Sequence, residues 1–81
     1  MQITRTTPSS ITVEKDGFVT KVLGESFAPG YGSPDFIVQS DSIDKWISGS
    51  RELPIDDSER REIVEFVLKE LRRRGWTIEA E

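Results

Sequence analysis

Apolar residues recur at every second position through the first part of the chain, which is the pattern typical of β-strands. Residues 10–14 alternate in this way, and Asp16 and Gly17 then supply a dipeptide that fits the positive φ angles of a type I′ hairpin turn. Residues 18–23 predict the returning strand, with apolar groups on both of its faces. Because both faces are apolar, we expect this strand at the centre of a sheet.

Other strands are indicated by shorter patterns. Residues 2–6 predict an N-terminal strand that ends at the first proline, since proline cannot donate to a strand ladder. Residues 35–39 predict another strand after a loop over 28–34, which holds two glycines and two prolines. The stretch 41–47 fits two interpretations, because its apolar residues have helical spacing while 43–46 also fits a strand with a bulge. We favour the strand.

The second half of the chain predicts one long helix over residues 57–74. Asp56 and Glu59 form a capping box, in which Asp56 accepts a backbone N–H bond and Glu59 reaches back to the cap. An apolar stripe with a period of 3.6 residues follows, and we expect it to be buried against the sheet. Its members are Ile63, Val64, Val67, Leu68 and Leu71. Gly75 ends the helix, and residues 76–79 predict a short final strand.

These elements predict an α+β fold. We expect a small antiparallel sheet of about four or five strands, packed by one C-terminal helix, with a short final strand returning to the sheet. Residues 1–81 are expected to form a single domain. A chain of 81 residues buries only roughly 60–65% of its unfolded surface on folding, so it has no room for a second core.

Composition narrows the function more than any motif does. The chain has 15 Asp plus Glu against 11 Lys plus Arg, which gives a net charge of −4, and it has neither histidine nor cysteine. It therefore lacks the commonest general base, the thiolate nucleophile and the commonest metal ligands. We expect no enzyme activity, no metal and no cofactor. The negative charge also argues against direct nucleic-acid binding, since that needs cations on the phosphates. A protein partner is expected instead, and a basic one suits this charge.

Three short features that suggest chemistry have simpler explanations. Asp35, Asp41 and Asp44 could offer carboxylates to a hard metal ion, but no calcium-loop pattern surrounds them. Residues 30–32, Gly-Tyr-Gly, resemble half of a phosphate loop without the lysine or the third glycine that such loops need. The arginines at 72–74 complement the dipole of the predicted helix. None of the three predicts catalysis.

The chain shows no pattern of export or membrane insertion. Its longest apolar runs are three residues, far below the ~20 needed to cross a bilayer, and its first residues alternate polar with apolar. We expect a soluble, cytoplasmic protein without a membrane partner.

Several short motifs occur in an order that resembles a known family. They are the Asp-Gly turn, Gly24-Glu25, residues 41–46 (Asp-Ser-Ile-Asp-Lys-Trp), Ile63-Val64 and residues 75–79 (Gly-Trp-Thr-Ile-Glu). The chain resembles small immunity proteins of bacterial polymorphic toxin systems, including contact-dependent growth inhibition. The resemblance implies an inhibitor that binds the cognate C-terminal toxin domain of a secreted effector, commonly a nuclease. The alternative is a regulatory or adaptor module without a toxin partner.

The partner surface is expected on the acidic and aromatic loops. The alternative is that the acids there only keep the domain soluble and that the toxin docks on the helix or on the open face of the sheet. Tyr31 lies between two glycines, and Asp35, Asp41 and Asp44 lie close to it along the chain. Carboxylates there could occupy the phosphate positions of a nuclease while the Tyr31 ring fills a neighbouring pocket. Trp46 is included as a candidate anchor, although core packing is the default expectation for it.

Overall fold

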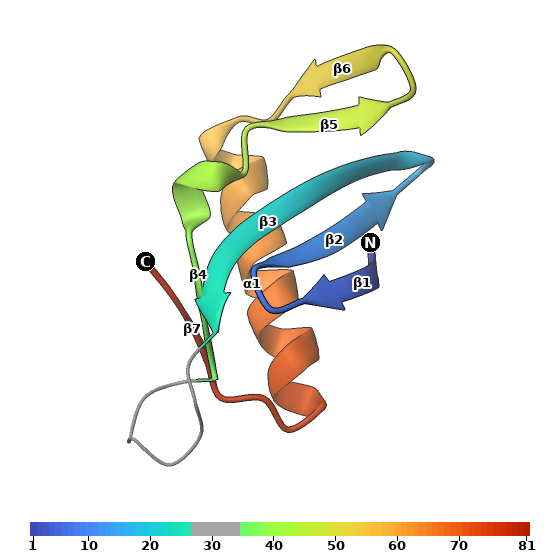
Figure 1. Ribbon diagram of the computed structural model, residues 1–81. Coiled ribbons are helices and arrows are strands. Elements are labelled where there is room, and N and C mark those ends of the chain that lie inside the picture. The colour runs from blue at the N-terminus through green and yellow to red at the C-terminus, as the bar shows by residue number, and fades with distance from the viewer. Residues whose placement is uncertain (27–34) are drawn as a thin grey trace.

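The computed structural model describes residues 1–26 and 35–81, which form one seven-stranded sheet with a long helix against one of its faces (Figure 1). In chain order the elements are β1 Gln2–Thr7, β2 Ser10–Lys15, β3 Phe18–Ser26, β4 Phe36–Val38, the 3₁₀ helix η1 Ser40–Ser42, β5 Lys45–Ser48, β6 Arg51–Pro54, α1 Asp57–Arg73 and β7 Ile78–Ala80. The predicted α+β class is confirmed, with more strands than the four or five expected.

The central strand is β3, as its two-sided apolar pattern predicts. It pairs with β2 along one edge, and β1 lies beyond β2. The turn between β2 and β3 has positive φ at both Asp16 (52°) and Gly17 (82°), which confirms the predicted type of hairpin. The other edge of β3 is divided between two partners. Val19 pairs with Ile47 of β5, whereas residues 24–26 pair with β4.

The prediction for 41–47 was half right. Residues 40–42 form a 3₁₀ turn, and the strand begins at Lys45 rather than at residue 43. The Ser42 hydroxyl explains the turn, because its Oγ donates to the Gln39 carbonyl oxygen (2.6 Å) and accepts from the Leu23 backbone N–H (3.0 Å). This side chain therefore joins the 3₁₀ turn to β3, and strand β5 begins only after the turn.

Strand β6 was not predicted at all. It follows β5 through a tight turn at Gly49, whose φ is +60°, and it pairs with β5 alone. All four of its residues are exposed, so it shows no alternation of apolar and polar side chains. Alternation marks a strand only where one face is buried, and this hairpin extends beyond the main core (Figure 1).

The final strand is parallel to its neighbour, which the prediction of an antiparallel sheet missed. Helix α1 carries the chain back to the end of the sheet where β4 begins, so β7 leaves in the same direction as β4, with Phe36 opposite Ile78. The Arg72 guanidinium donates to the Ile78 carbonyl oxygen (2.9 Å) and joins the end of the helix to this strand.

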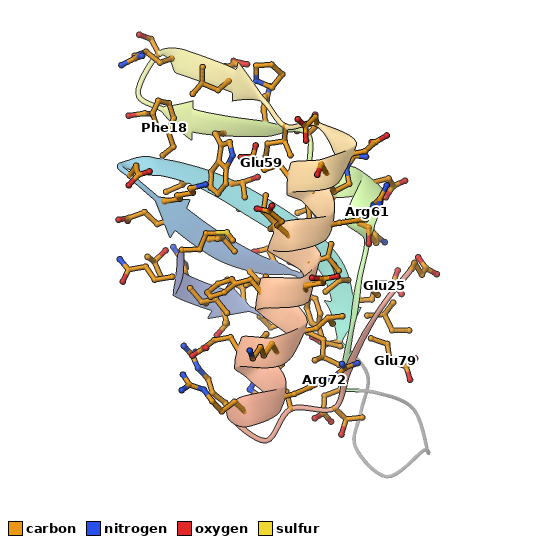
Figure 2. All side chains as sticks on the ribbon, turned by 180° about the vertical axis from the view of Figure 1, so that it is seen from behind. Phe18, Glu25, Glu59, Arg61, Arg72 and Glu79 are labelled. Atoms are coloured by element: carbon orange, nitrogen blue, oxygen red, sulfur yellow. The ribbon has the colours of Figure 1, made fainter. Side chains whose placement is uncertain are left out.

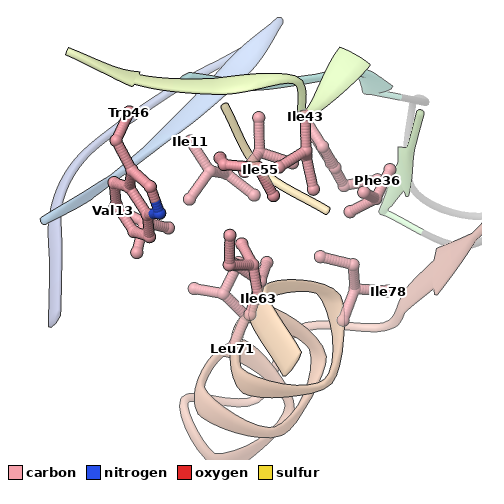
Figure 3. Close-up of a cluster of buried hydrophobic side chains, with 12 residues drawn as sticks. Ile11, Val13, Phe36, Ile43, Trp46, Ile55, Ile63, Leu71 and Ile78 are labelled. Carbon is pink, nitrogen blue, oxygen red and sulfur yellow. The ribbon is translucent and has the colours of Figure 1, made fainter. Parts of the chain in front are cut away.

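The core lies between α1 and the covered face of the sheet (Figure 3). Its buried apolar side chains are Ile11, Val13, Val22, Phe36, Val38, Ile43, Trp46, Ile55, Ile63, Val67, Leu71 and Ile78. Of the five helix positions predicted to be buried, Val64 and Leu68 are only half-buried, because they flank the line of contact with the sheet.

The Asp56 side chain caps the helix by accepting from the Glu59 N–H (2.7 Å). The Glu59 carboxylate was predicted to bond back to the cap residue. It instead accepts from the Trp46 indole Nε1–H (3.0 Å) and so joins α1 to β5.

Candidate functional site

One face of the sheet is left uncovered by the described part of the chain, since α1 lies entirely against the other face (Figures 1 and 2). Three aliphatic side chains project from this open face. Val19 is 36% exposed, Leu23 42% and Ile47 38%, and Val19 and Ile47 are direct cross-strand partners. An antiparallel sheet with one solvated face normally carries polar residues there. The open face of this sheet is instead partly apolar.

Carboxylates gather at the β4–β7 end of the same face. Ile37 of β4 pairs with Glu25 of β3 on one side and with Glu79 of β7 on the other, so the two carboxylates flank the isoleucine (Figure 2). A shallow pocket of about 120 Å³ lies there, lined by Glu25, Ile37, Gln39 and Glu81. Within residues 1–26 and 35–81, none of the three glutamates forms an ion pair. We call Glu25, Glu79 and Glu81 the acidic end of the open face.

A second hollow lies on the side of the sheet that carries α1. It is a cleft of about 200 Å³ between the β2–β3 turn, the β5–β6 hairpin and the first turn of α1. Its apolar walls are Phe18, Trp46 and Leu53, and Leu53 is 44% exposed. The Arg51 guanidinium lies 5.6 Å from the centre of the Phe18 ring, so a cation–π contact covers part of that ring.

The five predicted partner-binding residues have different places in the structure. Tyr31 lies outside the described residues. Trp46 is only 5% exposed, so core packing, the default expectation for it, is confirmed. Asp35 is exposed, and its carboxylate accepts from the Thr77 backbone N–H (3.0 Å), which binds the start of β4 to the approach to β7. Asp41, in η1, and Asp44 are both exposed.

The structure does not bring the three aspartates into one patch. Asp35 precedes β4 and Asp41 follows it, so they lie at opposite ends of that strand, more than about 10 Å apart at the rise of an extended chain. Asp35 instead lies beside the approach to β7, where its carboxylate is bonded to Thr77, two residues before Glu79. The role of all five residues in partner binding stays a prediction.

Sequence reasoning preferred the loops and gave the open sheet face only as an alternative, although the sequence held a signal for it. Residues 18–23 are apolar on both sides, and this pattern was taken to mean only that the strand is central. In the structure one side of β3, with Thr20 and Val22, is buried, while the other side, with Val19 and Leu23, is exposed. Glu25 and Glu79 gave no such signal, because they are 54 residues apart in the sequence. They come close only because β3 and β7 both pair with β4, where each glutamate lies opposite Ile37.

The described residues contain neither a cluster of metal ligands nor a helix that could span a membrane, and one of their acidic groups has a lowered pKa. No three histidine, cysteine or acidic side chains are grouped to hold a metal ion in the part of the chain that the structure describes. Hydrogen bonding to Arg73, with further attraction from Arg74, lowers the pKa of Glu70 in the last turns of α1. No described helix is long and apolar enough to cross a membrane.

The fold and its half-covered sheet define a small α+β protein whose distinctive chemistry lies on an exposed face. The family model described as Immunity protein 74 matches residues 2–81, so the chain belongs to this family of immunity proteins. The resemblance inferred from the sequence motifs is thereby confirmed. No curated protein and no solved structure matches the chain significantly.

Proposed function

We propose that this protein acts in the cytoplasm, where it neutralises a cognate toxin domain by binding it tightly and without catalysis. The observation that carries the proposal is the match of the immunity family over residues 2–81. Immunity implies a protein toxin as the partner, and we take that partner to be the C-terminal domain of a secreted effector. The absence of histidine and cysteine from the whole chain favours inhibition by occupancy over inhibition by chemistry.

A nuclease is the toxin that best suits the charge of this protein. An enzyme that holds nucleic acid must be basic where it contacts phosphates, and this chain has a net charge of −4. Complementary charge speeds the encounter of two proteins and disfavours wrong partners. An immunity protein must act before its toxin does damage, so a fast encounter is an advantage.

The test uses the toxin domain encoded beside the gene of this protein. Cells that express the toxin domain alone should stop growing, and co-expression of the intact 81-residue chain should restore growth and give a complex that co-purifies. A toxin domain from an unrelated system is the matched control, and it should be neither bound nor neutralised. Failure to protect or to co-purify with the cognate domain would refute the proposal.

Titration in vitro separates occupancy from catalysis. The nucleic-acid cleavage rate of the purified toxin should fall linearly and reach zero at one equivalent of this protein. Full inhibition by a small fraction of an equivalent would show that the protein inactivates the toxin catalytically. A toxin without nuclease activity would refute the nuclease assignment and leave the binding role intact.

A further inference from the structure

We propose that the open face of the sheet is the surface that binds the toxin, and that it takes a basic protein surface on which a lysine or arginine lies beside aliphatic side chains. The basic side chain would enter the pocket at the acidic end, and the aliphatic ones would cover Val19, Leu23 and Ile47. This inference rests on the proposed function, because it supplies the surface through which the toxin is held.

The first argument is that both faces of β3 carry apolar side chains, although Lys21 lies between Val19 and Leu23 on the open face. On the covered face α1 buries Val22 completely, while on the open face Val19 and Leu23 remain 36% and 42% exposed. Ile47 adds a third aliphatic group directly beside Val19. Grouped aliphatic side chains that stay in contact with water mark a surface for a partner. A partner on this face would bury its apolar side chains, as α1 buries those on the other face.

The second argument is the place of the charge. Glu25, Asp35, Glu79 and Glu81 are four of the fifteen acidic residues of the chain. The pairing of β3, β4 and β7 brings these four carboxylates to one end of the sheet. These carboxylates make this end of the sheet acidic, and a basic partner surface would complement it.

The third argument is the shape of the acidic end. The pocket of about 120 Å³ has the half-buried Ile37 among its lining residues, with Glu25, Gln39 and Glu81 around it. A lysine or arginine has a long aliphatic stem and a cationic head, so its stem fits over Ile37 while its head reaches the carboxylates. Charge-assisted hydrogen bonds of this kind are about twice as strong as neutral ones.

The open face is also large enough for a stable interface. Its strands cover about 20 Å across the sheet and about 30 Å along β3, from the usual strand spacing and rise, which gives about 600 Å². Stable interfaces bury about 600–1,000 Å² on each partner, so the open face reaches the lower end of that range. A second copy of this chain is a poorer occupant, because stacking two such faces with their acidic ends together would oppose like charges.

The experiment measures binding kinetics between the full chain and its cognate toxin domain at low and high salt. The double variant E25K/E79K should weaken binding at least 100-fold at low salt, mainly through slower association, and less at high salt. The matched control is E62K/E65K, which makes the same charge change on exposed positions of α1 and should change binding less than threefold. Thermal melts confirm that each variant is folded.

A second pair of variants tests the aliphatic part. L23S/I47S should speed dissociation at least tenfold, while L53S, in the cleft on the other side, should change it less than threefold. If the wild type binds and protects but both open-face variants bind normally, the inference is wrong and the proposed function stands.

Weakening by L53S alone would place the toxin in the cleft. A wild type that fails to bind the toxin refutes the proposed function and the inference with it. A dimer broken by L23S/I47S, with toxin binding unchanged, would make the face a self-interface and overturn the inference.

Discussion

Gly24→Ala adds only one methyl group to this chain and should nevertheless lower its stability strongly. It lies in β3 opposite Val38, directly against the Phe36 ring. A Cβ atom added to its backbone would lie 2.3 Å from Phe36 Cε1 and 2.4 Å from the Ile37 carbonyl oxygen. Ordinary contacts of a Cβ atom begin near 3.4 Å, so Gly24→Ala requires movement of about 1 Å.

Neither neighbour of Gly24 can make that movement freely. The Phe36 ring is fully buried in the core, and the Ile37 oxygen belongs to the backbone of β4, which is paired on both sides. Overpacking of a core commonly costs 1–3 kcal/mol, so we expect Gly24→Ala to cost about 3 kcal/mol of the free energy of unfolding. For a domain of this size that loss lowers the Tm by about 12–24 °C.

Guanidinium unfolding followed by circular dichroism measures the loss directly. The matched control is Gly49→Ala, where φ is +60° and no atom lies within 4 Å of the added Cβ. Its cost should come from backbone conformation alone, about 1–2 kcal/mol. The double variant G24A/F36L should recover part of the Gly24→Ala loss, because it removes the ring but leaves the Ile37 oxygen in place. A Gly24→Ala loss below about 1 kcal/mol, or below that of the control, would refute the steric argument.

Three further predictions concern the helix and the loop acids. Leu71→Ala should cost about 2–5 kcal/mol in urea unfolding, because the side chain is fully buried, and a silent change would contradict its place in the core. Since the Arg73 hydrogen bond lowers the pKa of Glu70 from its ordinary 4.5, the stabilisation is present above that pH and is lost as the pH falls below it. Glu70→Gln should therefore make Tm less dependent on acid between about pH 5 and 3, and an unchanged slope would contradict this. Reversal of Asp41 and Asp44 to lysine should slow toxin association several-fold at low salt and less at high salt, and rates equal to wild type at every salt would exclude both from the binding surface.

Local patterns predicted the elements whose partners are close in sequence. The Asp16-Gly17 dipeptide sets the β2–β3 hairpin because its positive φ angles are a property of the turn itself. Helix α1 was predicted to within one residue at its end, because the Asp56 cap, the apolar period and Gly75 all act within a turn or two of the backbone. Such elements depend little on the rest of the fold.

The remaining features depend on contacts between distant residues, and no local pattern contains them. The parallel direction of β7 follows from where α1 ends, and the exposed β6 is a strand only because β5 lies beside it. The acidic end forms only where β3, β4 and β7 pair, so no pattern in the sequence marked Glu25 and Glu79 as site residues. The aspartates that were chosen are neighbours in sequence, and an extended strand separates two of them in space.

The divided edge of β3 makes the two flanks of this sheet separable. The β5–β6 hairpin is joined to β3 through the single pair Val19 and Ile47, while β4 and β7 are held by three pairs each at the far end. The outer strand β6, whose four residues are all exposed, can therefore open locally while Trp46 keeps β5 in the core, and the β6 backbone amides should exchange with solvent first. A partner that covers Ile47 would hold the hairpin shut. Protection of β6 amides would then report on occupancy of the open face, because Glu52 of β6 is the cross-strand neighbour of Ile47.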